Sequence, residues 1–384
     1  MSKRISKGLS ANGTAILTQD AWNAELDAKH QRLVEFLERQ KLAGVLLRRN
    51  ENIAWLTGGA IELRVLTPCE TGVAAVLVTA SGRRCYFTTE NEAPRLHDEE
   101  FGKLDFEPVT FPWFADSTLD AARKIAAGPL GSDSGGENTV PVSLYPLRAS
   151  LMGSEKERYR WLGAEVAAAT VESLHQIEPG MSEFDIEALT AANLLRRGIQ
   201  PSVYLYAVDE RILKYKHAVP RGARLKQYAM LNLCARKFGL AISITRFAHF
   251  GQPPAQLADR FAIAAKVNAA LLHATRTGAT GAQLYQAAAS AYSAAGFPGE
   301  ERLHHQGGAT GYWEREWVAT PTGSETVVDN QAFAWNPSIQ GGKAEDTVLL
   351  SNGSIEWLTA TPTLPVINAS VEGQSYPAAG ILVR

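Results

Sequence analysis

The sequence is poor in cysteine and carries almost no net charge. Its 384 residues include three cysteines, Cys69, Cys85 and Cys234, which are widely spaced and odd in number. This pattern argues against a disulfide framework and against a cysteine-rich metal site. The 38 basic and 40 acidic residues leave a net charge of −2, so no basic excess favours nucleic acid or an anionic membrane surface as a partner.

Long apolar runs are also missing. No segment approaches the roughly 20 apolar residues of a membrane span, and the first residues carry no apolar core long enough for a signal peptide. What the chain does have is 45% hydrophobic and 20% charged residues, which is too apolar for a disordered protein. These proportions predict a globular, cytoplasmic enzyme, and the length allows two or three domains with sizeable cores.

The spacing of apolar residues predicts alternating strands and helices in the first part of the chain. We expect a helix over 20–42, a strand over 44–49, a short helix over 51–59 and a hairpin over 71–89. The turn of that hairpin should lie at Ser81-Gly82. The glycine-rich segment 128–141 is interpreted as a loop.

Helices are more frequent in the second part of the chain. A long helix should begin at Ser154, with Glu157 in the capping-box position, and should end before Pro179. Further helices are expected over 182–198, 254–275 and 281–295, and hairpins over 228–251 and 333–350. We place the domain boundary near residue 152, which gives domains over 1–152 and 153–384.

Each of the two later hairpins should present one polar pair within an apolar sheet. In an antiparallel hairpin, residues equally distant from the turn centre lie opposite each other, with Cβ atoms roughly 5 Å apart. A turn centred between residues 237 and 238 puts Asn232 opposite Ser243. A turn centred between residues 340 and 341 puts Asn336 opposite Glu345.

An ordered set of motifs carries a resemblance to a known family. The motifs are LLRRNENIAWLTGG, EVAAATVESLHQIEPGMSEFDIEA, KHAVPRGARL, NLCARKFGLAISITR, LHHQGGATGY and NPSIQGGKAEDTVLLSNGSIEWLT. Together they resemble the creatinase, prolidase and aminopeptidase P superfamily over nearly the whole chain. The resemblance implies an α/β (α+β) protein with a small N-terminal creatinase-like domain and a C-terminal pita-bread catalytic domain. It also implies a homodimer, in which the small domain of one subunit lies near the site of the other.

The chain departs from the metal-dependent pattern of that superfamily. Metallopeptidases of this kind hold two divalent metals, and the resemblance places their ligands on Asn232, Ser243, His305, Asn336 and Glu345. One histidine and one carboxylate are therefore kept, whereas two divalent ions need about four carboxylates for neutrality. We predict no dinuclear metal centre and no other cofactor. A single ion at His305 and Glu345 remains an alternative.

The resemblance also assigns roles to the remaining polar residues. His217, in KHAVP, falls on the family's catalytic histidine, and an imidazole that titrates near neutrality can move a proton. His305 and Glu345 would orient the scissile group. His304 stands at a family glycine position, so we expect it to point to the opposite face and to be structural.

Two arginines and one tyrosine complete the predicted site. Arg315 and Arg64 align with arginines that bind the substrate carboxylate in creatinase, and a planar guanidinium suits that task. Whether Arg64 acts within its own subunit or across the dimer stays open. Tyr312 would add an aromatic wall, although core packing is the commoner role for such a residue.

The leading hypothesis is a metal-independent, creatinase-like hydrolase. It would cleave a C–N bond in a small carboxylate-bearing nitrogen compound, with His217 as acid and base. Asn232, Ser243 and Asn336 would donate hydrogen bonds to the substrate. Three alternatives stay open: a non-catalytic pita-bread binding protein, a lyase on the same scaffold, and a degenerate metal-dependent Xaa-Pro peptidase.

Overall fold

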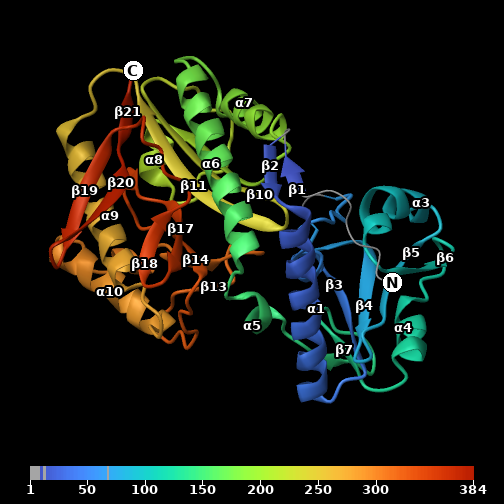
Figure 1. The fold of residues 1–384 in the computed structure, drawn as a ribbon. Helices are drawn as coiled ribbons and strands as arrows, with labels where there is room; N and C mark the ends of the chain where they lie inside the picture. Colours follow the sequence, from blue (N-terminus) through green and yellow to red (C-terminus); the bar gives the residue numbers. More distant parts are fainter. Residues whose placement is uncertain (1–8, 12–13, 67–68) are drawn as a thin grey trace. The chain divides into compact units, whose positions relative to one another are not determined.

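The computed structural model describes residues 9–11, 14–66 and 69–384, which form two compact units (Figure 1). The first takes in the chain up to Arg158 together with Phe238–Leu240, and the second takes in Tyr159–Lys237 and Ala241–Arg384. The sequence placed the domain boundary near residue 152, whereas this division falls within helix α6 (Gly153–Gln176). Among the described residues, no helix combines the length and apolar character needed to cross a membrane.

A six-stranded mixed sheet forms the centre of the first unit, in the order β6-β5-β4-β3-β7-β8. Its strands are β3 (Gly44–Arg49), β4 (Thr71–Thr79), β5 (Arg84–Thr89), β6 (Glu107–Phe111), β7 (Leu130–Ser132) and β8 (Val140–Pro141). The ribbon β1 (Leu9–Ala11) and β2 (Thr14–Leu17) precedes the helices α1 (Gln19–Gln40), α2 (Asn50–Leu56), α3 (Ala93–Arg95), α4 (Thr118–Ala126) and α5 (Tyr145–Arg148). The helices, strand and hairpin predicted up to residue 89 are confirmed.

The interpretation of residues 128–141 as a loop is wrong for part of that segment. Strand β7 pairs in parallel with β3, where Ser132 lies beside Leu46, and its residues are buried. A strand of three residues is too short to show a period-2 pattern. Its parallel partner is distant in sequence, so only the assembled sheet reveals it.

Helices α1 and α6 share a buried cluster of four charged side chains. Glu25 accepts two hydrogen bonds from the Arg158 guanidinium, both of 2.6 Å, and one from the Lys29 ammonium at 2.6 Å. Lys29 also pairs with Glu155 at 2.8 Å, and none of the four side chains is exposed. Burial acts to raise the pKa of Glu25, but Lys29 and Arg158 outweigh it and lower the pKa to about 2.

His30 on the same helix makes the stability of the fold depend on pH. Its Nδ1 lies 2.9 Å from the Arg84 guanidinium, which can only donate, so the ring proton is assigned to Nε2. Burial, followed by the positive charges of Arg84 and Lys29, lowers the pKa of His30 from 6.5 to about 3. The folded state therefore keeps this imidazole neutral while the unfolded chain takes up a proton near pH 6.5.

Because of His30, we expect the free energy of unfolding to decrease as the pH falls from 6.5 towards 3. The slope should approach about 1.4 kcal/mol per pH unit, because only the unfolded state binds the proton in that range. Urea unfolding at pH 7, 6 and 5 should show a steeper loss for the natural protein than for His30→Gln. The exposed His97→Gln serves as the control and should keep the natural slope. Equal slopes for all three proteins would contradict the prediction.

The second unit contains two main sheets, in the orders β21-β11-β10-β9 and β13-β12-β14-β17-β18. The first has β9 (Gln200–Val208), β10 (Tyr228–Lys237), β11 (Leu240–His249) and β21 (Ile381–Val383). The second has β12 (Gly307–Thr310), β13 (Trp317–Val318), β14 (Gln331–Trp335), β17 (Asp346–Ser351) and β18 (Ser354–Trp357). Two ribbons pair β15 (Ser338–Ile339) with β16 (Gly342–Lys343) and β19 (Val366–Val371) with β20 (Gln374–Ala379).

The helices of this unit are α6, α7 (Glu183–Leu195), α8 (Glu210–Lys214), α9 (Ala255–Ala274) and α10 (Gly281–Ala294). Helices α9 and α10 lie side by side at one edge of it (Figure 1). The helix predicted from residue 182 is confirmed, with Ser182 as its N-cap and Asp185 completing a capping box. The Ser154–Glu157 box is wrong: the helix begins one residue earlier, and Glu155 accepts the Met152 backbone N–H at 2.7 Å.

The predicted register is right for one hairpin and shifted for the other. Ser338 pairs with Lys343, and Trp335 pairs with Asp346, which confirms the pairing frame that puts Asn336 opposite Glu345. In the earlier hairpin the strands meet at Phe238-Gly239, one residue later than predicted. A shift of the turn centre by one residue changes the cross-strand partner of each residue by two positions. Each side chain therefore stays on the predicted face of the sheet but lies opposite a different residue.

Candidate functional site

Glu345 is the carboxylate on which the site converges. It precedes strand β17, is 4% exposed, and accepts hydrogen bonds from Asn232 at 2.6 Å and from the Thr245 hydroxyl. The Lys343 ammonium lies 3.0 Å from Oε2, and the Arg315 guanidinium lies 3.1 Å from Oε1. One buried anion therefore holds two cations.

The charge balance keeps Glu345 ionised. Burial acts to raise its pKa, but the charges of Lys343 and Arg315 and the Thr245 hydrogen bond lower the pKa to about 2. The neighbouring carboxylate of Asp346 does not contribute, because it binds Arg246 at 2.6 Å and the Thr359 hydroxyl at 2.7 Å. The local charge of the three site groups is thus one positive unit.

The Arg315 side chain contacts two of the positions at which the resemblance places metal ligands. Its Nη1 donates to the Ser243 hydroxyl at 2.9 Å while Nη2 donates to Glu345, so one guanidinium bridges two of the expected ligand positions. The residues present do not fit a pair of divalent ions, because a fixed cation already binds the single carboxylate of the set. We derive no chemical step through such a pair.

The shifted hairpin changes the roles of Asn232 and Ser243. Asn232 donates to Thr245 as well as to Glu345, and Ser243 contacts the Cys234 thiol at 3.1 Å. These side chains hold one another and Glu345 in place, and their hydrogen bonds to a substrate stay a prediction. Burial raises the pKa of Cys234 to about 11, so its thiol is not a poised nucleophile.

Three histidines form a second cluster. His217 comes from the loop between α8 and β10, and His304 and His305 precede strand β12. The Nε2 atoms of His217 and His304 lie 2.7 Å apart, and one nitrogen from each of the three rings lies within 4.8 Å of the others. The predicted outward orientation of His304 is wrong, because residues 303–306 are not in a strand and side-chain alternation does not apply.

The cluster is uncharged near neutral pH. Burial and then the Lys343 charge lower the pKa of His304 to about 2, and burial and then Arg315 lower the pKa of His305 to about 4. Burial, followed by Lys343, also lowers the pKa of His217. These causes show that the histidines share one electrostatic environment with the Glu345 cluster.

The remaining predicted residues have mixed placements. Asn336 is 3% exposed, and its side-chain Oδ1 has no hydrogen-bond partner among the described residues. Tyr312 is fully buried, which suits packing rather than an open aromatic wall. Arg64 lies in the first unit and pairs with Glu62 at 2.8 Å, so its role towards a substrate stays a prediction.

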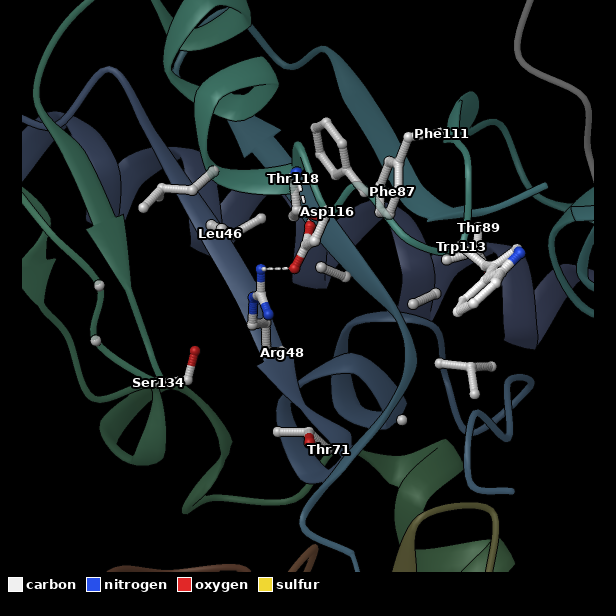
Figure 2. Close-up of a pocket in the computed structure, with 17 residues that line it drawn as sticks. Leu46, Arg48, Thr71, Phe87, Thr89, Phe111, Trp113, Asp116, Thr118 and Ser134 are labelled. Atoms are coloured by element: carbon white, nitrogen blue, oxygen red, sulfur yellow. Dashed lines mark hydrogen bonds and ion pairs between the residues drawn. The ribbon is translucent and has the colours of Figure 1, made fainter. Parts of the chain in front are cut away.

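A cavity of about 400 Å³ adjoins the site. Its lining includes Lys343, and also Lys216 and Leu303, the chain neighbours of His217 and His304. A second hollow of about 660 Å³ lies in the first unit, where Arg48 pairs with Asp116 at 3.5 Å (Figure 2). None of the predicted site residues lines either cavity, but Lys343, which pairs with Glu345, lines the 400 Å³ cavity, so we place the candidate site beside that one.

Thr245 and Lys343 belong to the site but were not predicted from the sequence. Both lie two residues from a recognised position, Thr245 from Ser243 and Lys343 from Glu345, and residues at i and i+2 in a strand share a face. That spacing could have revealed them. The partnership of His304 with His217 had no comparable signal.

Comparisons with known proteins agree with this architecture. Metallopeptidase family M24 matches residues 159–353, and the Creatinase/Prolidase N-terminal domain matches residues 29–179. No curated protein matches the chain in sequence.

Solved structures share the fold at low sequence identity. Dipeptidase PepE from Mycobacterium ulcerans has a TM-score of 0.70 and 17% identity over 88% of this chain and 96% of its own. Xaa-Pro dipeptidase from Bacillus anthracis has a TM-score of 0.70 and 17% identity over 94% and 100%. X-Pro aminopeptidase from Thermotoga maritima has a TM-score of 0.71 and 16% identity over 92% and 99%. The chain therefore belongs to metallopeptidase family M24, within the creatinase, prolidase and aminopeptidase P superfamily of pita-bread hydrolases.

Proposed function

We propose that the chain hydrolyses a C–N bond in a small carboxylate-bearing nitrogen compound, without the paired metal ions of its family. The observation that supports this most directly is the convergence of Lys343 and Arg315 on the single carboxylate of Glu345. The surplus positive charge favours an anionic group of the substrate. Because Lys343 lines the adjoining cavity, a substrate carboxylate there would meet a cation directly.

In this proposal His217 is the acid and base. It takes a proton from water, the resulting hydroxide attacks the carbon of the C–N bond, and the imidazolium returns the proton to the leaving nitrogen. One water is consumed, with its hydroxyl on carbon and its hydrogen on nitrogen. His304, hydrogen-bonded to His217, fixes the ring, and Asn336 stays a predicted donor to the substrate.

Glu345 acts as a positioning residue in this scheme. Its Oε1 is bound by Arg315 and its Oε2 by Asn232, Thr245 and Lys343, so it holds Lys343 and Arg315 in place. A homodimer, with Arg64 reaching the substrate carboxylate, stays part of the proposal. It is checked by light scattering of the purified protein.

The test is a ligand screen followed by turnover. Protein stripped with EDTA is screened for thermal stabilisation by guanidino acids, N-acyl amino acids and Xaa-Pro dipeptides, and each hit is assayed for turnover. We expect stabilisation by a compound that carries both a carboxylate and a C–N bond, and turnover that survives the chelator. Xaa-Pro cleavage that needs added metal would overturn the proposal. Stabilisation without turnover would favour a binding protein instead.

A further inference from the structure

The three histidines have the arrangement of a metal-binding triad. In a tetrahedral zinc site with bonds of about 2.0–2.1 Å, ligand nitrogens lie about 3.3 Å apart. The present spacings, 2.7 Å between two Nε2 atoms and at most 4.8 Å across the trio, bracket that value. A small rotation of the rings would bring three nitrogens to one ion.

Hydrogen bonds to neighbouring residues hold the two segments that carry these rings. The buried side chain of Gln306 donates to the His304 carbonyl at 2.6 Å and accepts from the Tyr292 hydroxyl at 3.1 Å. The Lys216 ammonium, next to His217, donates to the Ser338 carbonyl at 3.0 Å. Because the Tyr292 hydroxyl also donates to the Ser338 carbonyl at 3.0 Å, both segments are tied to the same residues, and the ligands are positioned before an ion binds.

The ligand type selects the class of ion. The trio offers imidazole nitrogens only, and the nearby Glu345 carboxylate is bound by Lys343 and Arg315, so a hard cation that needs carboxylate ligands is disfavoured. Neutral imidazole nitrogens instead suit zinc, cobalt, nickel and copper ions.

We propose that His217, His304 and His305 bind one transition-metal ion of the zinc class, with three nitrogen ligands and one open position. This ligand set is not the carboxylate-rich one that the family resemblance implies. Under the proposed function, the ion would bind the His217 ring nitrogen that otherwise accepts the proton. Zinc is therefore expected to inhibit turnover, and this second step rests on the proposed function.

Direct binding tests the site without an activity assay. Metal-free protein is titrated with Zn²⁺ by calorimetry and with Co²⁺ by visible absorption, with Mg²⁺ and Ca²⁺ as hard-cation comparisons. We expect one Zn²⁺ per chain, a cobalt spectrum of low coordination number and no Mg²⁺ or Ca²⁺ binding. His305→Ala should weaken Zn²⁺ binding by about 100-fold. The exposed His175→Ala, on helix α6, is the matched control and should bind as the natural protein does.

The outcomes separate the two proposals. Absence of Zn²⁺ binding, or Zn²⁺ affinity unchanged from the natural protein in both His305→Ala and His304→Ala, would overturn the metal site. If Zn²⁺ binds at the trio and turnover falls, both proposals are supported. If Zn²⁺ binds there and turnover rises or is unchanged, the site stands and the role of His217 as a metal-free base fails.

Discussion

Replacing His217 with alanine is expected to lower kcat by about 10²–10⁴-fold. This imidazole is exposed and meets His304, and the resemblance places it on the family's catalytic histidine. His305 is the other exposed ring of the trio. Since the groups that attract the carboxylate are Lys343 and Arg315, KM should change little. The side chain is exposed in a loop, so the variant should fold.

The assay uses the substrate identified by the ligand screen, in metal-free buffer. His175→Ala, another exposed histidine of the same unit, should keep the natural kcat. Unchanged kcat in His217→Ala would show that this histidine is not the acid and base. A rise in KM at constant kcat would instead show that it binds the substrate.

Replacing Glu25 with glutamine should lower the free energy of unfolding by about 3–5 kcal/mol. The change removes a carboxylate that pairs with Arg158 and Lys29, while the guanidinium stays fully buried. The cluster then keeps both cations with Glu155 as its one remaining carboxylate, so a buried positive charge is uncompensated. An uncompensated buried charge costs far more than the loss of an exposed ion pair.

Urea unfolding at pH 7 measures this effect. Glu35→Gln is the matched control, because Glu35 lies on the same helix and its pair with Arg39 is exposed, at 3.9 Å. The control should lose at most about 1 kcal/mol. A double change of Glu25→Leu with Arg158→Met should recover much of the loss, since it removes both charges together. Similar losses for Glu25→Gln and Glu35→Gln would contradict the prediction.

Local patterns predicted the helices and most of the hairpins. Helix α7 begins after Ser182 as its capping residues indicate, and the Asn336–Glu345 frame followed from a short turn. Patterns failed where the deciding contact is distant in sequence. Strand β7 is recognisable only through its parallel partner β3, and the β10–β11 turn lies one residue from its predicted place.

The same distinction between local pattern and distant contact applies to the candidate site. The amino-acid sequence alone established that the expected metal positions keep one carboxylate and one histidine, because the ligand chemistry of each side chain is a property of its residue type. It also established the family resemblance, through an ordered set of motifs. Both conclusions follow from residue types and their order along the chain.

The partners of those residues depend on how distant segments meet. Arg315 reaches Ser243, 72 residues away in the chain, and closes on Glu345, while His217 meets His304 across 87 residues. Such contacts arise when packing brings separate loops against one sheet, and no local pattern encodes them. The sequence thus showed that a metal pair lacks its ligands, and the folded chain showed that a guanidinium and an ammonium bind the carboxylate that remains.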